Sequence, residues 1–429
     1  LHQPSSNYGV NSLPLGKTRD SKGREREDAN DRATAQEILE YYDKVKDQFL
    51  DSGRVRCIFN AEYHQAENGD HILSLLNSTV EGKISDHNDN SSDKDKHCLS
   101  LENQVYTVKC RKVVRCISNV VVPSMRQGPN FLVDNSITVR SVNELPKEID
   151  KNNTKRRYIV LGAGKTGSDA IVYMLENGVD QSSITWVVSR DMWYFIREGI
   201  WTKNGENTYK DKITILERCL KVSKSADLFL DYEQSGIVGR LQPNNSKIPD
   251  IFRGATVDRE ELNKLRSIEN VIRLGRITSI DLESIVFEQG KVSLSSLGGA
   301  KDGLLIDCMA EGNGYEAISQ ARLFERGRIN IGPLLQIANP SFSAAIIAFL
   351  EATFNEECDD LKNQFCFYPH GEYAKLNMRG LLVNFYTQIK TTHAMSQYKP
   401  AAKFMLTSRT NPDAPMHHGG LLKFLWAIL

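Results

Sequence analysis

The feature that most constrains the fold is a glycine-rich turn in the middle of the chain. The segment "RRYIVLG" is a short β-rich run, and Gly162, Gly164 and Gly167 follow in the pattern G-x-G-x-x-G. An apolar, helix-like segment comes next, and "ITWVV" then has the composition of a second strand. A strand, a glycine turn, a helix and a second strand within about thirty residues are typical of the βαβ unit that binds dinucleotides. The pattern therefore predicts an α/β fold.

Each glycine of this turn has its own physical role in such a unit. Gly162 permits the tight turn, Gly164 lets a pyrophosphate approach the backbone, and Gly167 lets the helix and strand pack closely. The pyrophosphate is expected on the N–H groups at the helix start, where the helix dipole favours negative charge. The alternative is a glycine turn that serves the fold alone. We predict that the following consecutive residues bind a cofactor: Gly162, Ala163, Gly164, Lys165, Thr166 and Gly167.

The same stretch contains Gly164-Lys165-Thr166, which is also the ending of a Walker A phosphate loop. That motif requires a glycine five residues before Gly164, and Ile159 occupies this position. The phosphate-cradling loop would also be too short. A P-loop is therefore excluded.

The end of the second strand indicates which dinucleotide is bound. NAD sites usually place an acidic residue there for the ribose 2′-hydroxyl, whereas NADP sites offer an arginine. Here the strand "ITWVVSRD" ends in Ser189, Arg190 and Asp191. Ser189 can donate a hydrogen bond to a 2′-phosphate and Arg190 can pair with it, which predicts NADP. Asp191 keeps NAD open, and a solvated surface charge is the alternative for Arg190.

Length and composition exclude several classes of protein. A chain of 429 residues predicts two or three domains. Lys and Arg total 54, as do Asp and Glu, so no net charge favours nucleic-acid binding. The longest apolar runs, such as Ala344 to Leu350, are too short to cross a bilayer. No C-x-x-C pair and no zinc-like histidine spacing occur, so we predict no metal site and a cytoplasmic protein.

Local patterns predict the elements around the turn. Thr34 and Glu37 form a capping box that begins a helix, and "AENGD" lies between two strand-like runs as in a hairpin. The polar stretch from Ser78 to Ser100 has no period, and we predict a disordered insertion there. Asp258 is expected to cap a further helix. Helical character is predicted over these ranges: 214–236, 258–268, 341–354 and 419–429.

Several stretches together resemble a known family. "GAGKTGSDA" resembles the internal NADP loop of flavin-containing and Baeyer–Villiger-type monooxygenases, and "LHQPSSNYGVNS" is similar to their segment that passes the flavin ring. "YMLENGV", "SRDMW", "LLIDCMAEG" and "PSFSAAIIAFLEA" resemble a less-studied branch of FAD/NAD(P)-binding oxidoreductases. The similarity runs from Leu1 to about Pro369, with the insertion excluded.

The resemblance implies two Rossmann-like dinucleotide-binding domains, with the NADP domain inserted into the FAD domain. Residues 1–150 are then the remainder of the N-terminal half of the FAD domain, and residues 151–303 are the NAD(P)-binding domain with a helical insertion. Residues 304–429 return to the FAD domain and end in helices. No second G-x-G-x-x-G precedes Gly162. We therefore expect the first FAD βαβ unit to be missing, and the chain to be a truncated fragment that binds FAD poorly and lacks activity.

The implied activity is that of an FAD-dependent, NADPH-using oxidoreductase, with monooxygenation as one option. Hydride would pass from NADPH to the flavin, and electrons to O₂ or another acceptor, in the conversion of a small-molecule substrate. Motif position implies that His2 and Ser5 lie on the flavin side, and that Ser341 or Ser343 begins a helix aimed at the flavin. An ordinary loop role for His2 and plain core packing of that helix are the alternatives.

The chain departs from the family pattern at two places, and two other functional classes stay open. Ala310-Glu311-Gly312 stands where the family often has Ala-Thr-Gly, and the Phe-x-Gly-x-x-x-His signature of typical Baeyer–Villiger enzymes is missing. No catalytic acid or base is assigned. The alternatives are a single-cofactor NADP-dependent dehydrogenase and a non-catalytic NADP-binding protein.

Overall fold

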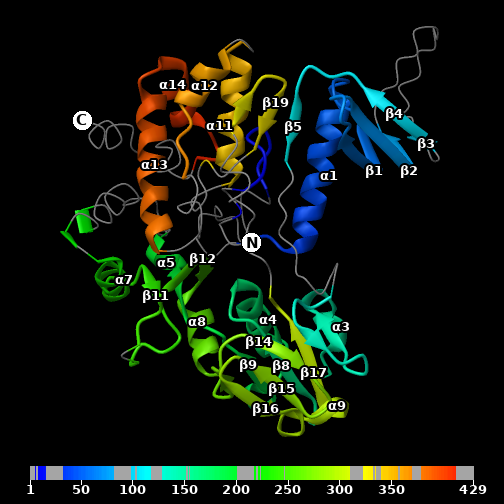
Figure 1. The fold of residues 1–429 in the computed structure, drawn as a ribbon. Coiled ribbons are helices and arrows are strands. Elements are labelled where there is room, and N and C mark those ends of the chain that lie inside the picture. The colour runs from blue at the N-terminus through cyan, green and yellow to red at the C-terminus, as the bar shows by residue number, and fades with distance from the viewer. Residues whose placement is uncertain are drawn as a thin grey trace, which may run out of the picture.

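The fold is that of a computed structural model of the chain (Figure 1). The structure describes these residues: 5, 8–15, 32–81, 98–101, 104–116, 128–150, 153, 155–200, 217–218, 221–222, 224–245, 247–309, 322–331, 334, 340–355, 358–369 and 378–411. The predicted helix over 419–429 and the Ala310-Glu311-Gly312 turn lie outside them.

Five parallel strands form the central sheet of the middle part of the chain. Their spatial order is β13 (Val271–Ile272), β9 (Ile184–Val187), β8 (Arg157–Leu161), β17 (Gly303–Asp307) and β7 (Val139–Ser141). The predicted α/β fold is confirmed, and the parallel sheet is consistent with a Rossmann-like domain. Because β7 and β17 belong to it, the sheet extends beyond the 151–303 segment on both sides.

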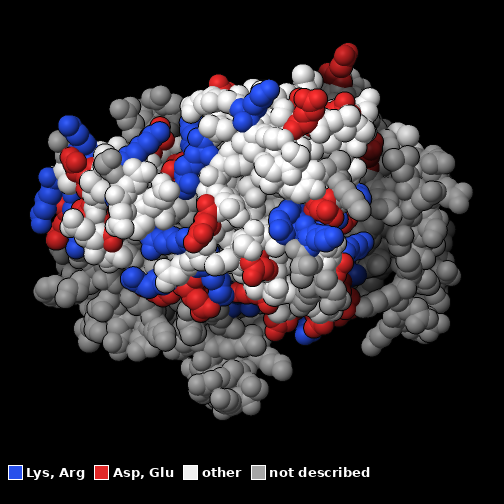
Figure 2. Space-filling view, turned by 90° about the horizontal axis from the view of Figure 1, so that it is seen from below, with Lys and Arg blue, Asp and Glu red and all other residues white. Residues whose placement is uncertain are grey.

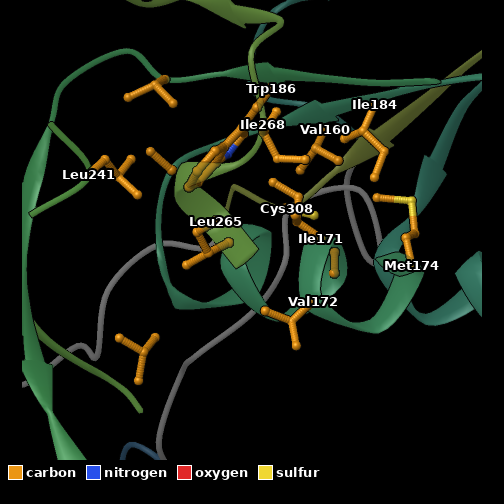
Figure 3. Packing of buried hydrophobic residues seen from close by; sticks show 14 of the residues in the cluster. Val160, Ile171, Val172, Met174, Ile184, Trp186, Leu241, Leu265, Ile268 and Cys308 are labelled. Atoms are coloured by element: carbon orange, nitrogen blue, oxygen red, sulfur yellow. The ribbon is translucent and has the colours of Figure 1, made fainter. Parts of the chain in front are cut away.

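One face of this sheet is covered by two helices. Tyr158 and Val160 of β8 belong to the same buried cluster as side chains of α4 (Lys165–Glu176) and α8 (Arg259–Arg266). In Figure 3, Ile171 and Met174 of α4 lie on one side of the cluster and Leu265 of α8 lies near Trp186 of β9. The indole of Trp186 is fully buried. Asp258 is the N-cap of α8, as predicted, and it forms a capping box with Glu261.

The other face of the parallel sheet is covered by a second sheet. Ile159 and Leu161, the alternate residues of β8, pack with Ile280, Ile285 and Phe287. This sheet has the order β16 (Gly290–Ser293), β15 (Ser284–Phe287), β14 (Ile277–Ile280), β6 (Leu132–Val133). Short elements at this end are α3 (Leu145–Glu148) and α9 (Gly299–Asp302). The strict alternation along β8 thus places it in the middle layer of three.

A third sheet extends the middle part of the chain beyond the parallel strands. Its order is β11 (Val238–Gly239), β10 (Met192–Ile196), β12 (Ile251–Val257). Trp193, Phe229 and Phe252 form its aromatic core, with ring centroids 5.5 and 5.4 Å apart around Phe229. Two helices accompany it, α5 (Arg197–Ile200) and α7 (Ser225–Gln234). The helix predicted within 214–236 is therefore present in its second half as α7.

The N-terminal part of the chain forms a helix and an antiparallel sheet. The predicted capping box of Thr34 and Glu37 is present and begins α1 (Ala35–Asp51). The predicted hairpin is also confirmed, as β1 (Cys57–Gln65) pairs antiparallel with β2 (His71–Glu81). The sheet is completed by β3 (Cys98–Leu101) and β4 (Gln104–Val108), which both pair with β2.

The prediction of disorder over Ser78 to Ser100 is wrong at both ends. Residues 78–81 continue β2, and residues 98–100 belong to β3. Their backbone groups pair with each other and with Cys57–Phe59 of β1, so the ladder satisfies N–H and C=O groups despite the polar composition. Residues 82–97 lie outside the described part of the chain.

The C-terminal part of the chain packs against the segment that precedes the middle part. Strand β5 (Val113–Arg115) pairs in parallel with β19 (Arg328–Asn330), which pairs with β18 (Phe324–Glu325). Lys112, directly before β5, forms ion pairs of 2.9 and 3.1 Å with Glu351 and Asp359. The helices of this part are α11 (Pro340–Thr353), α12 (Asp359–Gln364), α13 (Met378–Ser396) and α14 (Lys399–Thr407). The chain thus leaves this body, forms the middle part and returns to it (Figure 1).

Charge and hydropathy of the described surface agree with the composition. On the face that Figure 2 shows, basic and acidic side chains are interspersed and do not gather by sign. Within the ranges given above, no helix is long and apolar enough to cross a membrane. In the same ranges, no group of three or more His, Cys, Asp or Glu side chains is placed to hold a metal ion.

Candidate functional site

The glycine turn lies at the carboxyl edge of the parallel sheet. It follows β8 directly, and Gly164 is the N-cap of α4. The next strand in sequence, β9, lies beside β8 and runs parallel to it, so the predicted βαβ unit is present. The Gly162 N–H donates to the carbonyl of Val187 at 3.2 Å, which ties the turn to the end of β9. Ligands of open parallel sheets bind at this edge.

The three glycines differ in the space around them. Gly162 has a φ of +119°, a conformation that other residues rarely adopt. A Cβ on Gly167 would lie 2.1 Å from the Gly162 carbonyl oxygen, so α4 approaches the turn at a distance that only glycine allows. A Cβ on Gly164 would meet no atom within 4 Å. Glycine is thus required by the fold at positions 162 and 167, whereas the protein leaves room at 164.

Buried side chains from the neighbouring strands hold the carbonyl groups of the turn. The Trp186 Nε1–H donates to the Gly162 oxygen at 2.9 Å, and the Tyr194 hydroxyl donates to the Ala163 oxygen at 3.3 Å. The Ser168 N–H donates to the Gly164 oxygen at 3.0 Å. Burial raises the pKa of Tyr194, so the phenol keeps its proton and remains a donor. With its carbonyls fixed inwards, the turn presents the start of α4, whose first N–H groups lack intrahelical acceptors.

Trp186 and Tyr194 were not predicted as site residues. Trp186 lies in the predicted second strand, but its sequence position gives no sign that its ring reaches back to Gly162 across the sheet. Tyr194 comes from β10, which belongs to a different sheet. Aromatic residues with a polar tip in otherwise apolar strands were the available signal.

The other two loop residues lie in the first turn of α4. Lys165 forms an ion pair with Asp169, one helical turn further on. Lys165 and Thr166 are both half-buried at the helix start. An ammonium group at this position carries positive charge to the same edge as the helix dipole, which favours an anionic ligand.

Ser189 and Arg190 follow β9 at the same edge, as predicted. Ser189 is half-buried and Arg190 is exposed. Two further arginines, Arg253 and Arg276, lie close enough to affect each other electrostatically. Burial lowers the pKa of Arg253, and repulsion from Arg190 and Arg276 lowers it further. Arg253 therefore lies within electrostatic range of both Arg190 and Arg276.

The carboxylate of Asp191 is engaged by a fourth arginine. The Arg273 Nε and Nη2 atoms donate to the two Asp191 oxygens at 3.3 to 3.4 Å. The acidic residue that kept an NAD site open is thus paired within the protein. Arg273 and Asp191 were separated by 82 positions in the sequence, so only the fold reveals their pairing.

The described residues among those predicted for the flavin side lie in the other body. His2 lies outside the described residues, whereas Ser5 is buried with 1% of its surface exposed. Ser341 is the second residue of α11, and its hydroxyl accepts a hydrogen bond from the Gly9 N–H at 3.2 Å. The structure therefore brings the N-terminal segment and the start of α11 together across 332 positions. Ser343 is buried in the helix.

A basic side chain from the C-terminal part also holds the N-terminal segment. The Arg409 Nη2 atom donates to the carbonyl oxygens of Tyr8, Val10 and Leu13 at 2.9, 2.6 and 3.2 Å. The Tyr41 hydroxyl of α1 donates to the same Leu13 oxygen at 2.8 Å. Residues 8–13 are thus fixed between α1, α11 and the segment after α14.

Comparison with known proteins gives relatives but no function. No protein-family model matches the chain. Two proteins of Mycobacterium tuberculosis and one of Mycobacterium bovis, each described as uncharacterized, are 31% identical to it over 372 residues. The aligned region covers 85% of this chain and 60% of each relative. The chain therefore spans less than two thirds of the length of these relatives.

Proposed function

We propose that this chain binds NADPH at the carboxyl edge of its parallel sheet and is part of an FAD-dependent oxidoreductase. The observation that carries the proposal is the space at Gly164, where a Cβ would meet no protein atom within 4 Å. Gly162 and Gly167 are explained by backbone conformation and helix packing. Gly164, with a φ of −73°, has no such explanation. A pyrophosphate lying on the N–H groups of α4 supplies one.

The preference for NADPH rests on the charges beside the end of β9. Arg190, Arg253 and Arg276 together favour a dianionic 2′-phosphate, because an anion bound among them would offset the repulsion between their positive charges. The acid that would bind an NAD ribose, Asp191, is held by Arg273. Ser189 adds a hydroxyl donor at the same place. The proposed 2′-phosphate site thus contains three arginines, whereas the sequence indicated Arg190 alone.

Replacing Arg190 by Ala is expected to weaken NADPH binding about tenfold and to leave NADH binding nearly unchanged. The variant loses a charge-assisted contact to the 2′-phosphate, which NADH lacks, and such contacts are worth roughly 1.5–3 kcal/mol. Isothermal titration with both cofactors measures the two affinities. Arg326→Ala, an exposed arginine between β18 and β19, is the control for loss of one positive charge. Equal weakening of both cofactors by Arg190→Ala would contradict the assignment.

The flavin part of the proposal rests on the contacts between the N-terminal and C-terminal parts of the chain. The N-terminal segment, β5, β19 and α11 form one body that the middle part interrupts, and this supports an NADP domain inserted into an FAD domain. In this arrangement Ser5 and Ser341 are the described residues that would lie toward the flavin. Bound FAD would supply the acceptor for hydride from NADPH and pass electrons to O₂ or another acceptor, while the substrate is a small molecule.

The absorption spectrum tests the flavin part separately. We expect the full-length protein that contains this chain to purify with a flavin spectrum. NADPH should bleach this spectrum under anaerobic conditions. A colourless protein that still binds NADPH would support a single-cofactor dehydrogenase. Failure of NADPH to bleach a bound flavin would contradict the proposed direction of electron flow.

A further inference from the structure

Two carboxylates lie beside the start of the glycine-loop helix. Helices α4 and α8 run side by side, with the Lys264 Nζ atom at the end of α8 3.0 Å from the Glu176 carboxylate at the end of α4. Asp258 and Glu261 form the capping box at the start of α8, and the Lys165 ammonium group at the start of α4 lies within electrostatic range of the Glu261 carboxylate. Negative charge here would repel a pyrophosphate bound on α4.

Two arginines neutralise this acidic pair. Arg197 is fully buried, and its Nη1 and Nη2 atoms lie 3.1 Å from the Asp258 Oδ2 atom and 3.5 Å from the Glu261 Oε2 atom. Arg32 contacts the same two carboxylates, at 2.7 Å for Glu261 and 3.7 Å for Asp258. Burial alone would raise the pKa of Glu261. The Asp258 N–H and the nearby cations instead hold this pKa below its ordinary value, so the carboxyl is ionised at neutral pH.

The two arginines come from different bodies of the fold. Arg197 begins α5 in the middle part, and its position is fixed by complete burial. Arg32 lies two residues before Thr34, the N-cap of α1, and α1 is held by the N-terminal segment through Tyr41. Figure 1 shows α1 in the body above the parallel sheet, apart from α8. The Arg32 side chain is 33% exposed, whereas the Arg197 side chain is fully buried.

We propose that Arg32 couples dinucleotide affinity to the docking of two parts of the chain. These are the N-terminal body, which contains α1, and the cofactor domain, which is the middle part with the glycine turn. This inference rests on the proposed NADPH site. With Arg32 in place, the acidic pair beside the α4 N-terminus is neutralised and the pyrophosphate is tolerated. When the N-terminal body moves away, one uncompensated negative charge returns to the edge and lowers the affinity. Because coupling is reciprocal, bound NADPH stabilises the docked arrangement by the same factor.

The test measures NADPH affinity in variants of the charge network. Arg32→Gln is expected to weaken NADPH binding about fivefold at low salt, the lower end of typical couplings, and less as added salt screens the repulsion. Arg32→Lys keeps the charge and should retain most of the affinity. Glu261→Gln removes the repelling charge and keeps a residue that can serve in the capping box, so it should bind at least as tightly as the wild type.

The double variant Arg32→Gln/Glu261→Gln separates charge from structure. Restored affinity in the double variant is expected if Arg32 acts by neutralising Glu261, whereas a merely structural loss would persist. Arg326→Gln controls for a general change in net charge. If the wild type binds NADPH and Arg32→Gln binds it with the same affinity, this inference is overturned and the proposed function is not. Wild-type protein that does not bind NADPH overturns the proposed function and this inference with it.

Discussion

Replacing Gly164 by Val is expected to abolish NADPH binding while the protein stays folded and loses only about 1 kcal/mol of stability, because valine is a poorer N-cap residue than glycine. The Gly164 backbone has a φ of −73° and a ψ of −178°, which valine adopts without strain. A Cβ there meets no protein atom within 4 Å, so the side chain enters the space assigned to the pyrophosphate. The loss should exceed a hundredfold in affinity, because the phosphates would be displaced from the N–H groups of α4.

Two measurements on the same sample check this expectation. Isothermal titration gives the affinity for NADPH, and urea unfolding followed by circular dichroism gives the stability. Gly164→Ala serves as a graded control, with a smaller loss of affinity and a similarly small loss of stability. A folded Gly164→Val protein that binds NADPH as the wild type does would remove the glycine loop from the site.

Replacing Gly167 by Ala is expected to act on the stability of the protein itself, whereas the Gly164 substitution acts mainly on NADPH binding. The new methyl carbon would lie 2.1 Å from the Gly162 oxygen and 3.2 Å from its carbonyl carbon. Gly162 cannot move away freely, because its oxygen accepts from Trp186 and its φ of +119° is already restricted to glycine. Helix α4 must shift from the sheet, at a cost of about 3 kcal/mol as in overpacked cores.

Urea unfolding compares Gly167→Ala with Gly164→Ala, which adds the same methyl group three positions earlier. The midpoint of Gly167→Ala should fall well below that of the wild type, and the midpoint of Gly164→Ala should fall much less, because that variant only replaces an N-cap glycine by a poorer N-cap residue. Equal midpoints for the two variants would show that α4 does not approach the turn as closely as described.

The sequence predicted the elements whose signals are local. The strand, turn and helix around Gly162 and the capping boxes of Thr34 and Asp258 depend on residues a few positions apart. The structure places these elements as predicted because neighbouring backbone groups alone determine them. The position of Arg190 at the sheet edge followed in the same way from the end of the second strand.

The contacts that shape the site depend on distant pairs and were not predicted. Trp186 and Tyr194 reach the turn from other strands, and Arg32 reaches Glu261 across 229 positions. A single sequence does not show which charged residue pairs with which, because arginine and glutamate are both common on protein surfaces. The error at the two ends of the Ser78 to Ser100 stretch has a related cause, since pairing of residues 79–81 with β1 and of residues 98–100 with β2 outweighs the polar composition.

The most direct test of the account is titration of the wild-type chain with NADPH and NADH by isothermal calorimetry. We predict one saturable NADPH site per chain, with weaker binding of NADH, because Arg190 and the arginines within electrostatic range of Arg253 favour the 2′-phosphate. Absence of saturable binding by either dinucleotide, in protein that unfolds cooperatively and is therefore folded, would contradict it.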